Sequence, residues 1–106
     1  MNQPTIKMRV KEKAGAIWLR ALIKHPMETG LRKDKKTGVM IPPHYISDVL
    51  VECNGETVFS ADWSTSISKN PFLSIKFYGS NGDTVRVSWK DNMGNSDFVE
   101  KTVGKK

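Results

Sequence analysis

Apolar and polar residues alternate one by one along several segments of this sequence, and this period of two constrains the fold more than any other feature. Between residues 83 and 90, Val85, Val87 and Trp89 occupy one phase, and the positions between them are polar. Successive side chains of a β-strand point to opposite faces of its sheet, so this pattern is typical of a strand with one buried face. No segment shows a convincing helical period. The alternation therefore predicts an all-β fold.

Turn signals separate about seven such segments. Asn54-Gly55 is the strongest of them, because both central positions of a type I′ hairpin turn need a positive φ. The expected strands cover residues 5–11, 16–24, 45–53, 56–60, a stretch after Pro71 that contains Leu73, Ile75 and Phe77, residues 83–90 and residues 95–103. This succession predicts an immunoglobulin-like antiparallel β-sandwich. A length of 106 residues suits one hydrophobic core, so we expect residues 1–106 to form a single domain.

The chain is basic, with 17 Lys and Arg against 11 Asp and Glu and a formal net charge of +6. This balance favours anionic partners. Basic residues are nevertheless spread along the chain, and their one dense run covers residues 32–36. A nucleic-acid-binding domain would interleave aromatic and basic side chains on one sheet face, or would carry a basic recognition helix. Neither pattern is visible in the order of the residues, so no nucleic-acid partner is expected.

Membrane insertion is not expected either. Residues 1–10 alternate charged and apolar side chains, whereas a signal peptide needs a continuous apolar stretch. No apolar run approaches the length of a membrane span. The residues by themselves thus indicate a soluble cytoplasmic protein.

The alternation stops between residues 25 and 44, where proline and glycine punctuate a charged stretch. This predicts a long loop, and a loop of this length within a compact domain is uncommon unless it is functional or disordered. We therefore expect it to contact a partner or an anion. The candidate residues are His25, Met27, Glu28, Arg32, Lys33 and Asp34. The alternative is a solvated loop that Glu28 and Asp34 fix through local ion pairs.

A second candidate partner surface consists of Trp18 and Leu22, which share the phase of their strand that faces away from the core. Exposed apolar side chains on a sheet face are often covered by another chain. A neighbouring loop of the same chain could also cover them.

The sequence contains no recognisable catalytic set. No Gly-x-Ser-x-Gly elbow is present, and the single cysteine, Cys53, is a candidate free thiol because it has no partner for an internal disulfide. It lies in the inward phase of its strand, which favours a small buried side chain. The alternative is a thiolate paired with His25 or His44.

Three short segments of the sequence bear on a metal site. His25-Pro26-Met27, His44-Tyr45-Ile46 and Cys53-Asn54 resemble segments of superoxide reductases, small immunoglobulin-like proteins whose iron is bound by four histidines and one cysteine. This chain has two histidines in total, so that site cannot be completed. No metal and no cofactor are expected, and both histidines are expected to bond backbone or solvent.

A resemblance that covers nearly the whole chain is to the SoxZ family. It rests first on His25-Pro26-Met27-Glu28-Thr29-Gly30-Leu31-Arg32-Lys33-Asp34 and Gly38-Val39-Met40-Ile41-Pro42, which are similar to that family's H-x-M-E-x-G-x-R-K-D and G-x-x-I-P signatures. The later landmarks are Asn54-Gly55, Val58-Phe59, Ser66-Ile67-Ser68-Lys69-Asn70-Pro71-Phe72, and the Trp89 strand before the turn at 91–94.

This resemblance implies a non-catalytic, structural subunit that pairs with SoxY in the SoxYZ carrier of thiosulfate oxidation. SoxY holds the sulfur intermediates on a cysteine in a glycine-rich C-terminal segment and presents them to other sulfur-oxidation enzymes. Cys53 has no such surroundings, so carrier chemistry is not transferred to it. The resemblance also implies a periplasmic location, reached by export with the partner, and a homo-oligomer is a further possibility for the isolated chain. A mononuclear iron redox protein is the alternative function.

Overall fold

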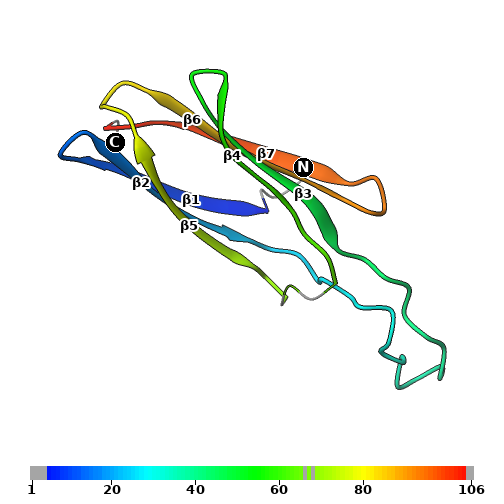
Figure 1. The fold of residues 1–106 in the computed structure, drawn as a ribbon. Helices are drawn as coiled ribbons and strands as arrows, with labels where there is room; N and C mark the ends of the chain where they lie inside the picture. The colour runs from blue at the N-terminus through cyan, green and yellow to red at the C-terminus, as the bar shows by residue number, and fades with distance from the viewer. Residues whose placement is uncertain (1–4, 66, 68, 105–106) are drawn as a thin grey trace.

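The computed structural model describes residues 5–65, 67 and 69–104, and its seven strands form two antiparallel sheets (Figure 1). The strands are β1 (Ile6–Lys13), β2 (Ala16–Ile23), β3 (Ile46–Cys53), β4 (Glu56–Asp62), β5 (Phe72–Tyr78), β6 (Thr84–Asp91) and β7 (Ser96–Thr102). One sheet has the order β1-β2-β5 and the other the order β4-β3-β6-β7. The predicted all-β sandwich is confirmed. In the part of the chain that the structure describes, no helix is long and apolar enough to cross a membrane.

The inward phases of the two sheets form the core, as the alternation predicted. Ile17 and Leu19 of β2 are fully buried, and so are Val51 of β3 and Val87 of β6. Burying one aliphatic side chain of this size stabilises the fold by roughly 1.5–3 kcal/mol relative to leaving it exposed. The same alternation leaves the opposite face of each sheet open to solvent.

The turn between β3 and β4 has the geometry that its sequence predicted. Asn54 and Gly55 have φ values of 52° and 84°, the left-handed values that a type I′ turn requires. The Asn54 side chain also accepts a hydrogen bond from the Thr84 backbone N–H at 2.9 Å and donates one to Asp83 Oδ1 at 3.1 Å. These bonds tie the hairpin to the start of β6.

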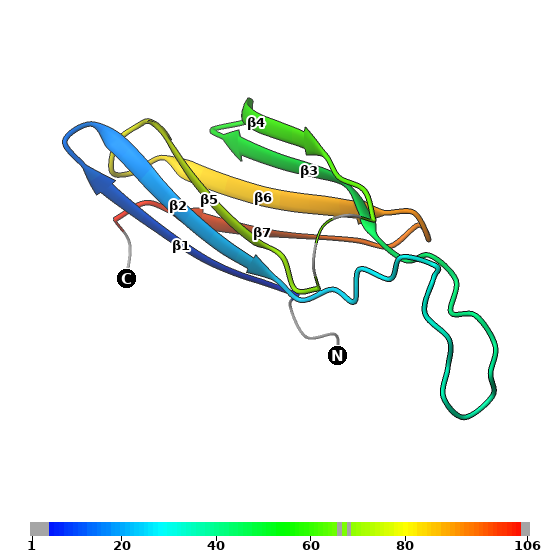
Figure 2. The same cartoon turned by 60° about the horizontal axis from the view of Figure 1, so that its bottom comes forward.

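Residues 28–44 project from one end of the sandwich as a narrow arm (Figure 2). Isolated bridges between Glu28 and His44 and between Lys33 and Met40 join its two sides, so the predicted loop folds as an irregular hairpin. Gly30 has a φ of +88°, and a Cβ at this position would come within 2.8 Å of Pro43 Cγ. Glycine at this position therefore avoids both a strained backbone and a clash with the other side of the arm.

Candidate functional site

The base of the arm is fixed by three ionisable side chains from three parts of the chain. His25 follows β2, His44 precedes β3, and Asp91 ends β6. Both histidine Nε2 atoms lie within hydrogen-bond distance of the same oxygen, Asp91 Oδ2, at 3.0 Å for His25 and 2.7 Å for His44. Asn95 Nδ2 donates to this oxygen at 3.2 Å. We call these four residues the base cluster.

The hydrogen bonds at the base cluster fix the charge of Asp91. Burial alone would raise the pKa of Asp91, but hydrogen bonds from His25, from the backbone of Asn95 and from His44 outweigh it and hold that pKa well below its usual range. Burial lowers the pKa of His25, and the hydrogen bond to Asp91 opposes this only in part. His25 Nδ1 accepts a hydrogen bond from the Met27 backbone N–H at 3.1 Å, so Nε2 carries the proton that is donated to Asp91. Asp91 is thus held as a carboxylate by the hydrogen bonds that it accepts.

Two residues predicted to lie on the loop surface are in the interior instead. His25 and Met27 are both buried, and Met27 Sδ accepts a hydrogen bond from the Ile46 backbone N–H at 3.3 Å. Contacts of His25 with Asp91 and of Met27 with Ile46 keep the first residues after β2 in the core. These two positions anchor the arm and do not form its surface.

The expectation that both histidines would bond backbone or solvent holds in part, since His25 Nδ1 accepts its bond from the Met27 backbone, but both Nε2 atoms have a side-chain partner. Their shared partner is Asp91, which the sequence showed only as a turn residue. The ligand atoms of His25, His44 and Asp91 lie within 4.8 Å of one another, so these three side chains could hold a metal ion although no metal was expected. The set is a hydrogen-bonded cluster of two imidazoles and one carboxylate.

Cys53 takes no part in this cluster. It ends β3 at the opposite end from His44, and a rise of about 3.3 Å per residue along the strand separates them by more than 20 Å. Cys53 is a half-buried free thiol whose Sγ lies 3.7 Å from Asp83 Oδ2. Burial and the Asp83 charge both raise the pKa of the thiol. Neither the thiolate–histidine pair nor a cysteine ligand beside the two histidines is formed.

The remaining loop candidates lie on the arm. Arg32 donates two hydrogen bonds to the Glu28 carboxylate, one of them from Nε at 3.1 Å, and this pair holds the pKa of Glu28 below its usual value. Asp34 Oδ1 accepts a hydrogen bond from the Lys36 backbone N–H at 2.8 Å, so this side chain shapes the turn at the tip of the arm. Lys33 is exposed, and its backbone forms the bridge with Met40. The ion pair expected for Glu28 is present, whereas Asp34 acts through the backbone.

The arm also exposes apolar side chains that the sequence-based choice of charged residues missed. Leu31 is 82% exposed, and Val39 and Met40 are exposed on the other side of the arm. They belong to the two motif strings at 25–34 and 38–42, but they follow no strand or helix period that would have identified an outward-facing side. Large exposed apolar side chains gathered on a projecting segment are typical of a contact surface.

Trp18 and Leu22 lie on the outward face of the β1-β2-β5 sheet, where they are 47% and 41% exposed. No described loop buries them, and their surroundings on this face are basic. This face combines aromatic and basic side chains, the pattern that the residue order did not reveal. The reason is that β5 supplies part of it from a segment about 50 residues beyond β2.

One family of known proteins matches this chain. The match is to the family described as sulphur oxidation protein SoxZ, and it covers residues 6–102. Among curated proteins, no sequence matches. The matched region contains all seven strands, the arm and the base cluster. The chain therefore belongs to the SoxZ family of sulphur oxidation proteins.

Proposed function

We propose that this chain is the non-catalytic, structural subunit that pairs with SoxY to form the SoxYZ carrier of covalently bound sulfur intermediates in thiosulfate oxidation. The single observation that carries the proposal is the family match over residues 6–102. In this division of labour SoxY provides the cysteine that carries sulfur, and this chain supports and presents its partner. The raised pKa of Cys53 agrees with this, since a thiol is a poor nucleophile until it is deprotonated.

The arm is the surface proposed to contact SoxY. Leu31, Val39 and Met40 expose apolar area there, and burying it against a partner would be favourable. The base cluster fixes the direction of the arm, because Asp91 holds one histidine from each side of it. A pre-organised arm loses less conformational entropy on binding than a free loop would.

The proposed location is the periplasm, reached by export together with SoxY. Export of a folded pair requires a complex that does not dissociate on the way, and stable interfaces of this kind bury roughly 1,600 Å² or more in total. A projecting arm that reaches around the partner would enlarge the buried area beyond what one sheet face provides.

The proposal is tested by co-expressing the chain with SoxY and measuring the mass of the purified complex by light scattering. The wild-type chain is expected to give a stable 1:1 heterodimer. Leu31→Ser combined with Val39→Ser is expected to weaken pairing by at least tenfold. These side chains are exposed in the free chain, and the variant loses the apolar area that they would bury in the complex with SoxY. Val58→Ser on β4 is the matched control, since it removes an exposed apolar side chain far from the arm. A wild-type chain that stays unbound beside SoxY would contradict the proposed function.

A further inference from the structure

The outward face of the β1-β2-β5 sheet is uniformly basic. Its outward positions contain six cations and no carboxylate: Lys7, Arg9, Lys11, Lys13, Arg20 and Lys76. The one acidic residue of these three strands is Glu12, which lies in the opposite phase and accepts a hydrogen bond from the Gly15 backbone N–H at 2.9 Å. We call this surface the basic face.

None of the six cations forms an ion pair with a carboxylate in the described part of the chain, whereas elsewhere Arg86 pairs with Glu100 at 3.3 Å. Arg9 and Arg20 are direct cross-strand neighbours of β1 and β2. Like charges placed directly opposite each other destabilise an antiparallel pair. The basic face therefore carries an electrostatic cost in the isolated chain that an anionic partner would relieve.

Apolar side chains are set among these cations. Trp18 lies beside Lys11 on β1 and Lys76 on β5, and Lys76 Nζ is 4.8 Å from the centre of its ring. Phe72 and Tyr78 stand at the two ends of β5, and Tyr78 is 93% exposed. Aromatic and Arg side chains are the usual anchors of protein interfaces, because they combine a large contact area with polar groups.

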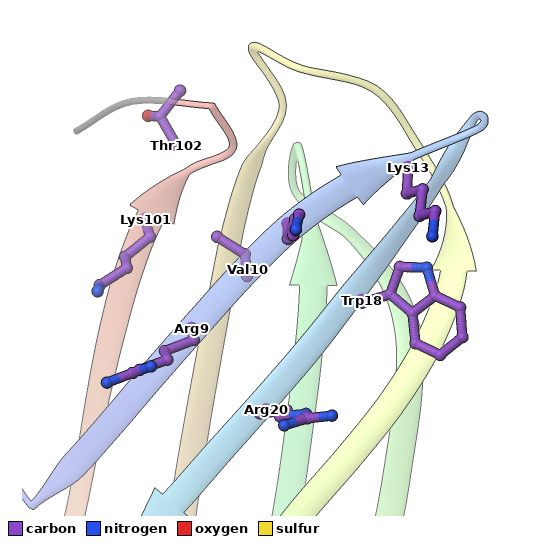
Figure 3. Close-up of a pocket in the computed structure, with 8 residues that line it drawn as sticks. Arg9, Val10, Lys13, Trp18, Arg20, Lys101 and Thr102 are labelled. Carbon is purple, nitrogen blue, oxygen red and sulfur yellow. The ribbon is translucent and has the colours of Figure 1, made fainter.

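A groove runs along this face and over the free edge of β1 (Figure 3). It has a volume of about 910 Å³ and is lined by Arg9, Val10, Lys11, Lys13, Trp18, Arg20, Lys101 and Thr102. Five of these eight residues are cations, so a partner that enters the groove meets positive charge from two strands and from β7 at the edge of the second sheet.

We propose that the basic face is a docking surface, separate from the arm, for an acidic patch on a second protein. That second protein is an enzyme that acts on the carrier. This inference rests on the proposed function. Lysine is depleted at the buried core of protein interfaces, whereas complementary charges that face each other raise association rates and suit short-lived complexes. A carrier that is presented to several enzymes in turn needs short-lived complexes of this kind.

The geometry favours an acidic protein over single-stranded nucleic acid. Nucleic-acid platforms stack successive bases on aromatic rings that lie next to one another. Here Phe72 and Tyr78 are six residues apart on one strand, a separation of about 20 Å. The ring of Trp18 already holds the ammonium of Lys76.

The test measures binding of poly-L-glutamate to the isolated chain and to its complex with SoxY at several salt concentrations. Arg9→Gln combined with Arg20→Gln is expected to weaken binding about fivefold to tenfold at low salt, since two exposed ionic contacts are lost. Arg86→Gln combined with Lys90→Gln is the matched control, because it removes the same charge from the outward face of β6 in the other sheet. The control is expected to bind poly-L-glutamate within twofold of the wild type, and both double variants are expected to pair with SoxY.

Four results would overturn the inference. The first is equal binding of poly-L-glutamate by the Arg9/Arg20 variant and the wild type. The second is tighter binding of a single-stranded oligothymidylate than of poly-L-glutamate, which would indicate a nucleic-acid surface. The third is loss of poly-L-glutamate binding when SoxY is present. The fourth is loss of SoxY pairing in the Arg9/Arg20 variant. Each of these two results would place the permanent interface with SoxY on the basic face. Failure of the wild-type chain to pair with SoxY is a separate result that counts against the proposed function alone.

Discussion

His44 Nε2 lies 2.7 Å from Asp91 Oδ2, so the residue that returns the arm to the sandwich is bound to the last residue of β6. His25 binds the same oxygen from the other side of the arm. One buried carboxylate therefore sets the positions at which the arm leaves and re-enters the fold. Any change at Asp91 is expected to act on the arm and on global stability together.

Asp91→Asn is expected to lower the free energy of unfolding by about 2–4 kcal/mol, because the amide would replace a carboxylate that accepts hydrogen bonds from both histidines, and one buried polar group would be left unpaired. Urea denaturation followed by tryptophan fluorescence measures this change. Asp62→Asn on β4 is the matched control, since Asp62 is exposed, and it is expected to change stability by less than about 0.5 kcal/mol. Equal stability of the two variants would contradict the role assigned to the base cluster.

Stability is expected to fall as the pH is lowered from 7.5 to 5. The pKa of His25 is lowered in the folded state, mainly by burial. Below the ordinary histidine pKa of 6.5, the unfolded chain therefore binds more protons than the folded chain. Stability from the neutral imidazole is therefore present above that value and is lost as the pH falls through it. The depressed pKa of Asp91 adds a second loss at lower pH, below the ordinary value of 3.8. Urea midpoints at a series of pH values measure both.

The matched variants for this pH dependence are His25→Gln and His44→Gln. His25→Gln is expected to flatten the slope of the urea midpoint against pH between pH 7.5 and 5, because the buried imidazole is gone. The second is expected to keep most of the slope, because His25 remains in place. A wild-type midpoint that stays constant over this range would count against a buried neutral His25.

The strands could be predicted from the sequence because each is set by local alternation. The six strands predicted with bounds differ from those bounds by at most two residues, and Asn54-Gly55 forms the turn that its residue types require. The pairing of β2 with β5 could not be predicted in this way, since about 50 residues separate them and sheet order depends on long-range contacts. That pairing brings Lys76, Phe72 and Tyr78 to the basic face, whereas its other five cations lie on β1 and β2, where local alternation already gives their outward phase.

The base cluster was only half predictable. His25 and His44 stood out as the two histidines, and the motif string placed them at the two ends of the loop. Asp91 did not stand out as a site residue, because its position at the end of a strand and the start of a turn already accounted for an acidic residue there. Its burial depends on how β6 packs beside β3, and no local pattern reports that contact. The motif string likewise showed His25 and Met27 as loop residues, although packing places both in the core.

Gly30→Ala is expected to loosen the arm. Gly30 has a φ of +88°, and the added Cβ would lie 2.8 Å from Pro43 Cγ, so the two sides of the arm would have to separate. Gly38→Ala is the matched control, because Gly38 has a similar φ of +72° but open space around it, and it pays only the backbone cost of roughly 1–2 kcal/mol. Limited proteolysis at the arm lysines should be faster for Gly30→Ala than for Gly38→Ala. Equal cleavage rates would show that contact with Pro43 does not hold the arm together.

Cys53 is expected to react slowly with iodoacetamide at pH 7.5. Burial and the neighbouring Asp83 carboxylate raise the pKa of its thiol, and only the thiolate reacts. Asp83→Asn removes the charge and is expected to speed alkylation severalfold, which mass spectrometry over a time course measures. Asp62→Asn is again the control, since Asp62 is at the far end of the β3–β4 hairpin from Cys53. A wild-type alkylation rate equal to that of a free cysteine peptide would mean that Cys53 is a reactive thiol. That result would contradict the proposal that Cys53 takes no part in the sulfur chemistry of the carrier.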